Sequence, residues 1–266
     1  RGHHHGARRL ARVLPRDHDP FADRLELARV RDEQHRPAAP HDDRIGKVGG
    51  KSDVRLVARR LADDGQVGVF GPLAEEIERL DMLCASLPAS VTLRLDANAA
   101  WDAADAERFL AACLPLPIDG IEEPLRTPDI ATLHRLQAMV PFPLAIDEST
   151  HLITCEFWQA PPVRRLVIKP ARHGGLLAST ELALRARACG LEVIVTSALE
   201  SACGIATLAH LAAAVAPDAV HGLATGEWLV SDVGQPPLIV DGRIQLPRDN
   251  GIGFALAGKR GGSAST

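Results

Sequence analysis

The sequence contains no tyrosine, and aromatic residues make up only 3% of its 266 residues. A core with so few aromatic side chains must be built from leucine, alanine, valine and isoleucine, which suits helices packed on parallel strands. No stretch approaches the ~20 consecutive apolar residues of a membrane-spanning helix, and the N-terminus lacks the apolar run of a signal peptide. We therefore expect a cytoplasmic protein whose apolar residues, 46% of the total, fill a sizeable core.

Other signals are also missing. The cysteines are odd in number and show no paired spacing, so we interpret them as reduced thiols. No GxGxxG or Walker loop follows any apolar run, which argues against a nucleotide cradle. A net charge of −4 gives no sign of a nucleic-acid partner. The cysteines are Cys84, Cys113, Cys155, Cys189 and Cys203.

Charge is spread unevenly along the chain. Residues 1–66 hold half of the basic residues and carry a net charge of +4, whereas the remainder carries −8. This first quarter shows no sustained alternation, which favours a disordered segment or a stretch that is not native sequence, such as one read in a shifted frame. The alternatives are a basic arm for an acidic partner and, at His3, His4 and His5, a tag remnant or a weak metal site.

From about residue 72 the pattern becomes regular and alternates strands with helices. Asp102 and Asp129 are placed to cap two of the helices, and Gly190 is placed to end a third. Asp241-Gly242 between alternating runs predicts a hairpin near the C-terminus. We expect six strands, near residues 92–96, 119–123, 144–147, 165–169, 192–196 and 221–225.

This alternation predicts an α/β fold with a parallel sheet, and the spacing of the strands favours a (β/α) barrel of the TIM type. A closed barrel needs eight strands, so at least one must come from the N-terminal region or the C-terminal hairpin. We therefore expect a barrel that is incomplete or modified at its N-terminal end; a doubly wound sheet is the alternative. The chain divides into an irregular segment at 1–66, a barrel domain at 67–256 and a flexible tail at 257–266.

Four charged residues end successive strand-like runs: Asp96 in TLRLDAN, Glu122 in DGIEEP, Asp147 in PLAIDES and Lys169 in RRLVIKP. The steps between them are 26, 25 and 22 residues, close to the roughly 30 residues of one βα unit. Parallel barrel strands point their C-terminal ends at one mouth, so the four side chains should meet there. Each alone has an ordinary explanation as a turn, cap or surface residue. Together they suit Mg²⁺, because crowded carboxylates repel one another unless a cation holds them.

These runs resemble the metal and lysine motifs of the enolase superfamily, in its muconate-lactonising subgroup. The resemblance covers about residues 72–256 and rests on LRLDANAAW, IEEP, AIDES and VIKP followed by a Gly-Gly pair. The later runs SALESACGIATLAHLAA and HGLATGEWLVSDVGQPPLIVDGRIQLPRDNGIG look most like o-succinylbenzoate synthases. Dipeptide epimerases and N-acylamino-acid racemases share the same metal triad, so the motifs are more specific for the superfamily than for the reaction.

The resemblance implies a Mg²⁺-dependent carbon–oxygen lyase of menaquinone biosynthesis that acts on a small-molecule carboxylate. Asp96, Glu122 and Asp147 would ligate the metal, and Glu123 would lie behind them. Lys169 would face the reacting carbon, where an α-proton leaves and an enediolate is stabilised. Burial and the nearby metal would lower the pKa of this lysine toward neutrality.

Three further polar residues, Asn98, Ser197 and Thr225, lie at expected strand ends. They are candidates for substrate contacts, or else ordinary turn and cap residues. The family also carries an α+β capping domain over the barrel mouth, and residues 1–66 do not resemble it. We therefore expect the cap to be largely missing, which would weaken both water exclusion and specificity.

The chain departs from the family at a second lysine, which stands in a Lys-x-Lys-Val-Gly motif one strand before Asp96. Lys47 in RIGKVGG fits locally, but Ile45 replaces the first lysine, and 49 residues separate Lys47 from Asp96. Counting back 30 residues reaches Gln66, whose amide cannot serve as a base. Either Lys47 serves the site across an insertion, or Gln66 takes the lysine position and the enzyme is impaired. We favour the second, which leaves a non-catalytic remnant or binding protein as a further alternative.

Overall fold

The computed structural model describes residues 10–13, 64–68, 72–88, 91–226, 229–240, 242–246 and 251–256, the first two ranges by their backbone alone. Helices and strands alternate along most of this length. The strands are β1 Leu10–Val13, β2 Asp64–Gly68, β3 Thr92–Asp96, β4 Ile118–Glu122, β5 Leu144–Ile146, β6 Arg165–Ile168, β7 Glu192–Val195, β8 Val220–His221, β9 Ile239–Val240 and β10 Arg243–Gln245. The helices are α2 Leu73–Ser86, α3 Ala103–Cys113, α4 Ile130–Met139, the 3₁₀ helix η1 Thr150–Leu152, α5 Cys155–Gln159, α6 Gly175–Ala188 and α7 Ala202–Val215.

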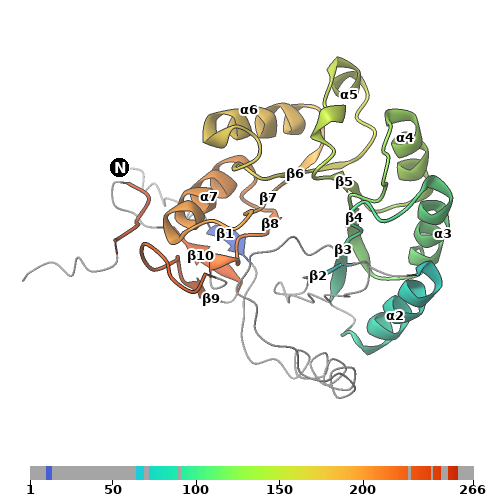
Figure 1. Ribbon diagram of the computed structural model, residues 1–266, viewed down its shortest axis with the longest axis horizontal. Helices are drawn as coiled ribbons and strands as arrows, with labels where there is room; N and C mark the ends of the chain where they lie inside the picture. Colours follow the sequence, from blue (N-terminus) through green and yellow to red (C-terminus); the bar gives the residue numbers. More distant parts are fainter. Residues whose placement is uncertain are drawn as a thin grey trace, which may run out of the picture.

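Six parallel strands form one continuous sheet in the order β2-β3-β4-β5-β6-β7. The sheet curls, and the helices lie along its outer side (Figure 1). A bridge between Thr196 and Gly222 continues the parallel pairing from β7 toward β8. The expected α/β barrel, incomplete at its N-terminal end, is confirmed as a partial TIM barrel.

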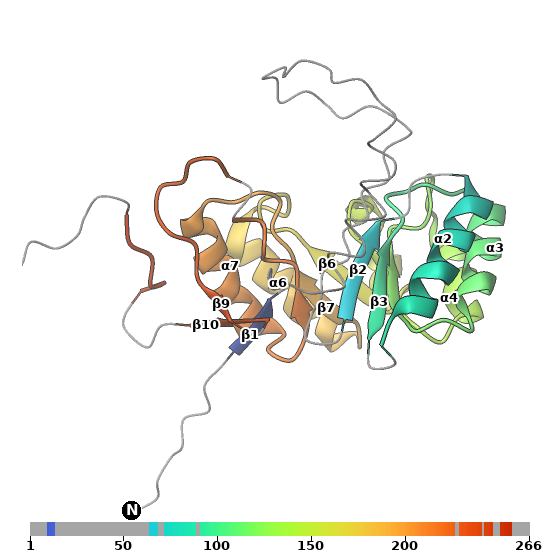
Figure 2. The same cartoon turned by 90° about the horizontal axis from the view of Figure 1, so that it is seen from below.

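The additional strands come from the N-terminal part of the chain, as one of the two expectations had it. β1 pairs with β8 in parallel and with β10 in antiparallel fashion, while β2 pairs in parallel with β3. Figure 2 shows β1 beside β10 at one side of the molecule and β2 beside β3 toward the other. The expected domain boundary at residue 66 therefore falls inside β2, and β1 lies within the segment 1–66.

The predicted helix caps, the helix end at Gly190 and the C-terminal hairpin are all present in the structure. The side chains of Asp102 and Asp129 accept hydrogen bonds from the first turns of α3 and α4. Gly190 follows α6 in the left-handed conformation, which glycine adopts without a steric penalty. β9 and β10 form the predicted antiparallel hairpin. None of the helices in the described ranges combines the length and apolarity that a membrane crossing needs.

One strand prediction was wrong in its bounds. The run expected at 221–225 forms a strand only as β8, Val220–His221, and then turns at Ala224 and Thr225. The turn carries Thr225 back toward the end of β7, where its hydroxyl is 2.7 Å from that of Ser197.

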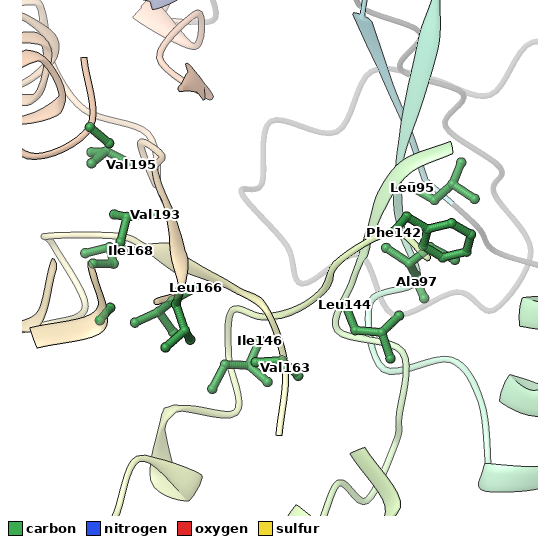
Figure 3. Close-up of a cluster of buried hydrophobic side chains, with 14 of the residues drawn as sticks. Leu95, Ala97, Phe142, Leu144, Ile146, Val163, Leu166, Ile168, Val193 and Val195 are labelled. Carbon is green, nitrogen blue, oxygen red and sulfur yellow. The ribbon is translucent and has the colours of Figure 1, made fainter. Parts of the chain in front are cut away.

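The main core lies between the sheet and the helices, because alternate strand residues point to that side. Leu95, Leu144, Leu166 and Val193 belong to one buried cluster that also contains the apolar faces of the helices (Figure 3). The other face of the sheet holds the small cluster Ala145, Val167 and Ile194. Charged residues lie toward both ends of these strands, and those at the C-terminal ends form the candidate site.

Candidate metal and active site

The four predicted charged residues come to the C-terminal ends of four neighbouring strands. Asp96 ends β3 and lies directly opposite Glu122, which ends β4. Asp147 follows β5, and Lys169 follows β6. We call these four residues the mouth. The structure therefore brings together the group that the strand spacing indicated.

Two of the three carboxylates of the mouth are buried, and Asp96 is half-buried. Glu122 is only 3% exposed and Asp147 only 6%. Burial raises the pKa of Asp96 to about 6, and the charge of Asp147 adds to the effect. Burial also raises the pKa of Glu122 to about 8, again with a contribution from Asp96. Such shifts arise when negative groups share a desolvated space, which is the situation that a cation relieves.

Lys169 pairs with two of the acids that follow β5. Its Nζ forms an ion pair with Asp147 and contacts Oε1 of Glu148 at 3.2 Å, and the same oxygen accepts a hydrogen bond from Arg172 at 3.2 Å. Burial alone would lower the pKa of Lys169, but the two carboxylates outweigh it and raise the pKa. The expected lowering assumed a metal ion near the amine, and it stays a prediction for the metal-bound site.

The donor set fits a hard divalent cation in its chemistry. Oδ1 of Asp147 is buried and has no hydrogen-bond partner in the described part of the chain, and an orphaned buried oxygen is costly unless something coordinates it. No cluster of three or more His, Cys, Asp or Glu side chains within the described ranges is already arranged around one metal position. The other oxygen of Asp147 is taken up by Lys169. The assignment of Asp96, Glu122 and Asp147 as Mg²⁺ ligands therefore stays a prediction.

Arg94, for which the sequence led to no prediction, approaches Glu122 from the side away from the C-terminal strand ends. Arg94, two residues before Asp96 on β3, is buried, and its Nε lies 4.0 Å from Oε1 of Glu122. The period of a strand does place residues 94 and 96 on the same face, which was the one available signal. The guanidinium also donates to the carbonyl of Val220 in β8, at 3.3 Å. It thereby connects β3 to a strand far away in the sequence.

The three candidate substrate contacts form local ties. Asn98 is exposed with a φ of 46°, and its N–H donates to the Asp96 carboxylate at 3.0 Å, which is the geometry of an Asx turn. Ser197 donates to the carbonyl of Gly222 at 3.1 Å and pairs with Thr225, both hydroxyls being buried. These bonds account for all three residues in turns and caps, and their contact with a substrate stays a prediction.

Of the two positions weighed for the second lysine, only that of Gln66 lies in the described residues. Lys47 lies outside the described residues. β2 does lie beside β3, as counting back one unit suggested, with the backbone of Gln66 opposite Arg94 and that of Gly68 opposite Asp96. No lysine occurs in β2, and Lys169 is the only lysine in the described part of the chain. Which residue takes the place of the family's second lysine stays a prediction.

Comparison with known proteins places this arrangement in a family. The family model described as "Enolase C-terminal domain-like" matches residues 50–260. The o-succinylbenzoate synthase of Mycobacterium bovis (strain BCG / Pasteur 1173P2) is 35% identical over 202 residues, which cover 73% of this chain and 57% of that protein. The chain thus spans little more than half the length of this curated relative.

Solved structures agree on the fold. The muconate cycloisomerase of Pseudomonas fluorescens matches with a TM-score of 0.69 and 23% identity, over 94% of this chain and 64% of that one. The L-Ala-D/L-Glu epimerase of Bacillus subtilis matches with a TM-score of 0.69 and 21% identity, over the same shares. The family match, the synthase relative and the strand-end residues agree, and the chain belongs to the enolase C-terminal domain-like family.

Proposed function

We propose that this chain is a Mg²⁺-dependent lyase that forms o-succinylbenzoate, a step of menaquinone biosynthesis, by removing an α-proton and then water from a small cyclic carboxylate. One observation carries the proposal. Three carboxylates, two of them buried and one half-buried, and one lysine end four neighbouring parallel strands, in a chain that is 35% identical to an o-succinylbenzoate synthase. The partner would be a small molecule, with no nucleic acid or membrane required.

The residues of the mouth would have two roles, metal binding and proton transfer. Asp96, Glu122 and Asp147 would hold Mg²⁺, which when bound would offset the charge that develops on the substrate carboxylate as the α-proton leaves. Lys169 stands at the neighbouring strand end, where its amine would hold or move the proton at the reacting carbon. For that role it must exchange its contact with Asp147 for the substrate. A cation held by Asp147 would favour this exchange, because the cation and the lysine amine would compete for the same carboxylate.

Two alternatives remain from the sequence. An epimerase or racemase acting next to a carboxylate is supported by the fold, which this chain shares with an L-Ala-D/L-Glu epimerase. Such a reaction needs a proton-transfer group on each face of the substrate, and Lys169 is the only lysine in the described part of the chain. A remnant that keeps the fold without catalysis is the other alternative, and it is supported by the absence of lysine from β2.

Proton–deuterium exchange at the substrate α-carbon, measured with and without Mg²⁺, separates the three. The panel contains the cyclohexadiene precursor of o-succinylbenzoate and several dipeptides. We expect Mg²⁺-dependent exchange and product formation with the precursor alone. We also expect Lys169→Met to reduce the rate by at least about 100-fold, the lower range for a positioned acid or base. Glu192→Gln, a carboxylate at the opposite end of the sheet, serves as the matched control and should stay active.

Each other result decides against the proposal. Exchange with dipeptides alone would identify an epimerase or racemase. No exchange with any compound, in a folded protein with saturating Mg²⁺, would identify the remnant.

A further inference from the structure

Strained backbone in the described residues gathers beside the mouth. Three non-glycine residues have φ in the left-handed region: Asn98 at 46°, Ala99 at 57° and Glu123 at 43°. They follow β3 and β4, the strands that end in Asp96 and Glu122. Residues with side chains rarely adopt this conformation, and it persists only where the surrounding structure imposes it. The contacts of Glu123 show what those surroundings are.

The backbone of Glu123 ties together the ends of three strands. Its carbonyl accepts a hydrogen bond from the N–H of Ala99 at 2.7 Å, in the loop that follows β3. Its own N–H donates to the carbonyl of Ala145 in β5 at 2.9 Å. The residue is also bonded covalently to Glu122. A shift of Glu123 would therefore be felt at all three strand ends that carry the carboxylates.

The side chain of Glu123 holds the loop that carries Asp147. It is only 2% exposed, and its Oε2 accepts the N–H groups of Asp147 at 2.8 Å, Glu148 at 3.0 Å and Ser149 at 3.3 Å. Its Oε1 accepts the hydroxyl of Ser149, which is itself buried. Hydrogen bonds to a carboxylate are roughly twice as strong as those to a neutral acceptor. Four donors on one carboxylate fix the direction in which residue 147 leaves its strand.

We propose that Glu123 is a positioning residue that holds Asp96, Glu122 and Asp147 in the mutual arrangement needed for one divalent cation. It does not bind the cation itself, because both of its oxygens are used by the loop at 147–149. Four hydrogen bonds hold the side chain of Glu123 in that loop. The binding of a cation here rests on the proposed function, but the contacts of Glu123 with the loop do not. The two can therefore be tested separately.

Glu123→Gln is the informative change, because the amide keeps the size and the hydrogen-bonding shape of the carboxylate. Its oxygen can still accept from the N–H groups, and its NH₂ group can face Ser149, whose hydroxyl then accepts. Only the charge is lost. We expect a folded protein in which Mg²⁺ binds at least tenfold more weakly, since groups that orient metal ligands contribute 10–100-fold in affinity. We also expect the amides of residues 147–149 to exchange with solvent about five times faster.

The experiment combines Mg²⁺ titration calorimetry with amide hydrogen exchange on the wild type, Glu123→Gln and Glu192→Gln. The last is the matched control, a carboxylate-to-amide change far from the mouth. The inference is supported when only Glu123→Gln weakens Mg²⁺ binding and speeds exchange at 147–149 while its thermal midpoint stays near that of the wild type. It is overturned when a folded Glu123→Gln binds Mg²⁺ as the wild type does, or exchanges at 147–149 as the wild type does.

If the wild type binds no Mg²⁺, the proposed function fails, and hydrogen exchange alone then decides whether Glu123 holds the loop. Ser149→Ala removes a single donor and takes the place of Glu123→Gln should the latter not fold. The same two readouts apply, with smaller expected changes of about two- to fivefold.

Discussion

The inner face of the sheet carries buried charged side chains at both ends of its strands, and the two ends differ in how these charges are paired. At the N-terminal end, which we call the floor, Arg94, Asp119, Arg165 and Glu192 form a network of ion pairs. Asp119 accepts hydrogen bonds at 3.0 Å from both guanidiniums, and Arg165 also pairs with Glu192 at 2.7 Å. Two positive and two negative groups therefore balance within the chain.

The mouth has no such balance. Asp96, Glu122 and Asp147 share one lysine and a 4.0 Å contact with Arg94. Burial would raise the pKa of Asp119 at the floor, but its two arginines outweigh it and lower the pKa. At the mouth burial prevails, and the pKa values of Asp96 and Glu122 rise to about 6 and about 8. The floor therefore balances its charge within the chain, whereas the mouth holds more negative than positive charge, which is consistent with the proposed cation site.

Breaking the floor should have the largest effect on folding. Asp119→Ala leaves the buried Arg94 and Arg165 without their shared acceptor, and removing one partner of a buried pair costs about 3–5 kcal/mol. We expect the free energy of unfolding in urea to fall by that amount. Glu107→Ala, which breaks the surface pair with Arg135, is the control and should cost less than about 1 kcal/mol. Equal losses for the two variants would show that the floor network is no stronger than a surface pair.

Acid should affect the two ends in opposite directions when no metal is present. Near the floor, His221 accepts from the Val195 N–H at 3.0 Å and lies 2.9 Å from the Ala216 carbonyl, to which Nε2 donates. Burial lowers its pKa from 6.5 to about 4. The unfolded chain therefore takes up a proton first, and stability falls as pH drops from about 6.5 to 4, by about 3 kcal/mol in total.

The mouth works against this loss. The pKa values of Asp96 and Glu122 are raised in the folded state, so folding takes up protons there, and stability rises as pH falls from about 8 toward 4. Urea unfolding at several pH values, on the wild type and on His221→Gln, separates the two contributions. We expect His221→Gln to lose the fall between pH 6.5 and 4 and to keep the rise. Parallel pH profiles for the two proteins would show that His221 does not cause the fall in stability.

The residues of the mouth were predictable and those of the floor were not, for a physical reason. Asp96 and Lys169 end apolar runs, so the strand period and the unit spacing locate them without knowledge of any contact. Arg94 sits inside such a run, where the sequence indicates only that it is buried or strained. Its partners lie 25 and 126 residues away, on β4 and β8. Asp119 lies on the neighbouring strand, but the contact with β8 depends on the curling of the sheet, which no local pattern encodes.

Local irregularities were also beyond reach. The ladder between β3 and β4 shifts its register between Leu93, which lies opposite Ile118, and Arg94, which lies opposite Gly120. Asp119 is skipped by this shift, and its side chain accepts hydrogen bonds from Arg94. The carboxylate that pairs with Lys169 could not be identified from the sequence either. The sequence places its amine near three carboxylates, but it cannot say which of them the amine pairs with. The pairing with Asp147 and Glu148 raises the pKa of Lys169.

Supplying the missing charge should stabilise the mouth. A ligand that binds only the folded state at 100 times its dissociation constant adds about 2.7 kcal/mol. We expect Mg²⁺ to raise the free energy of unfolding by about this amount and a chelator to remove the gain. Asp147→Asn should abolish the gain, and the floor variant Glu192→Gln should keep it. A gain of the same size in Asp147→Asn would place the cation away from the mouth.

The smallest expected effect tests how tightly the floor is packed. A Cβ at Gly120 would collide with Nη1 of Arg165 and lie 2.9 Å from the carbonyl of Pro143. Gly120→Ala should therefore cost about 2 kcal/mol in the free energy of unfolding, as overpacking in a core commonly does. The φ of Gly120 is not in the left-handed region, so the cost would come from the collision and not from the backbone. Adding Gly120→Ala to Arg165→Met should then cost clearly less than adding it to the wild type, because the colliding nitrogen is gone. The same cost in both backgrounds would mean that the Pro143 carbonyl sets the limit and that Arg165 has room to move, which would contradict a rigid floor.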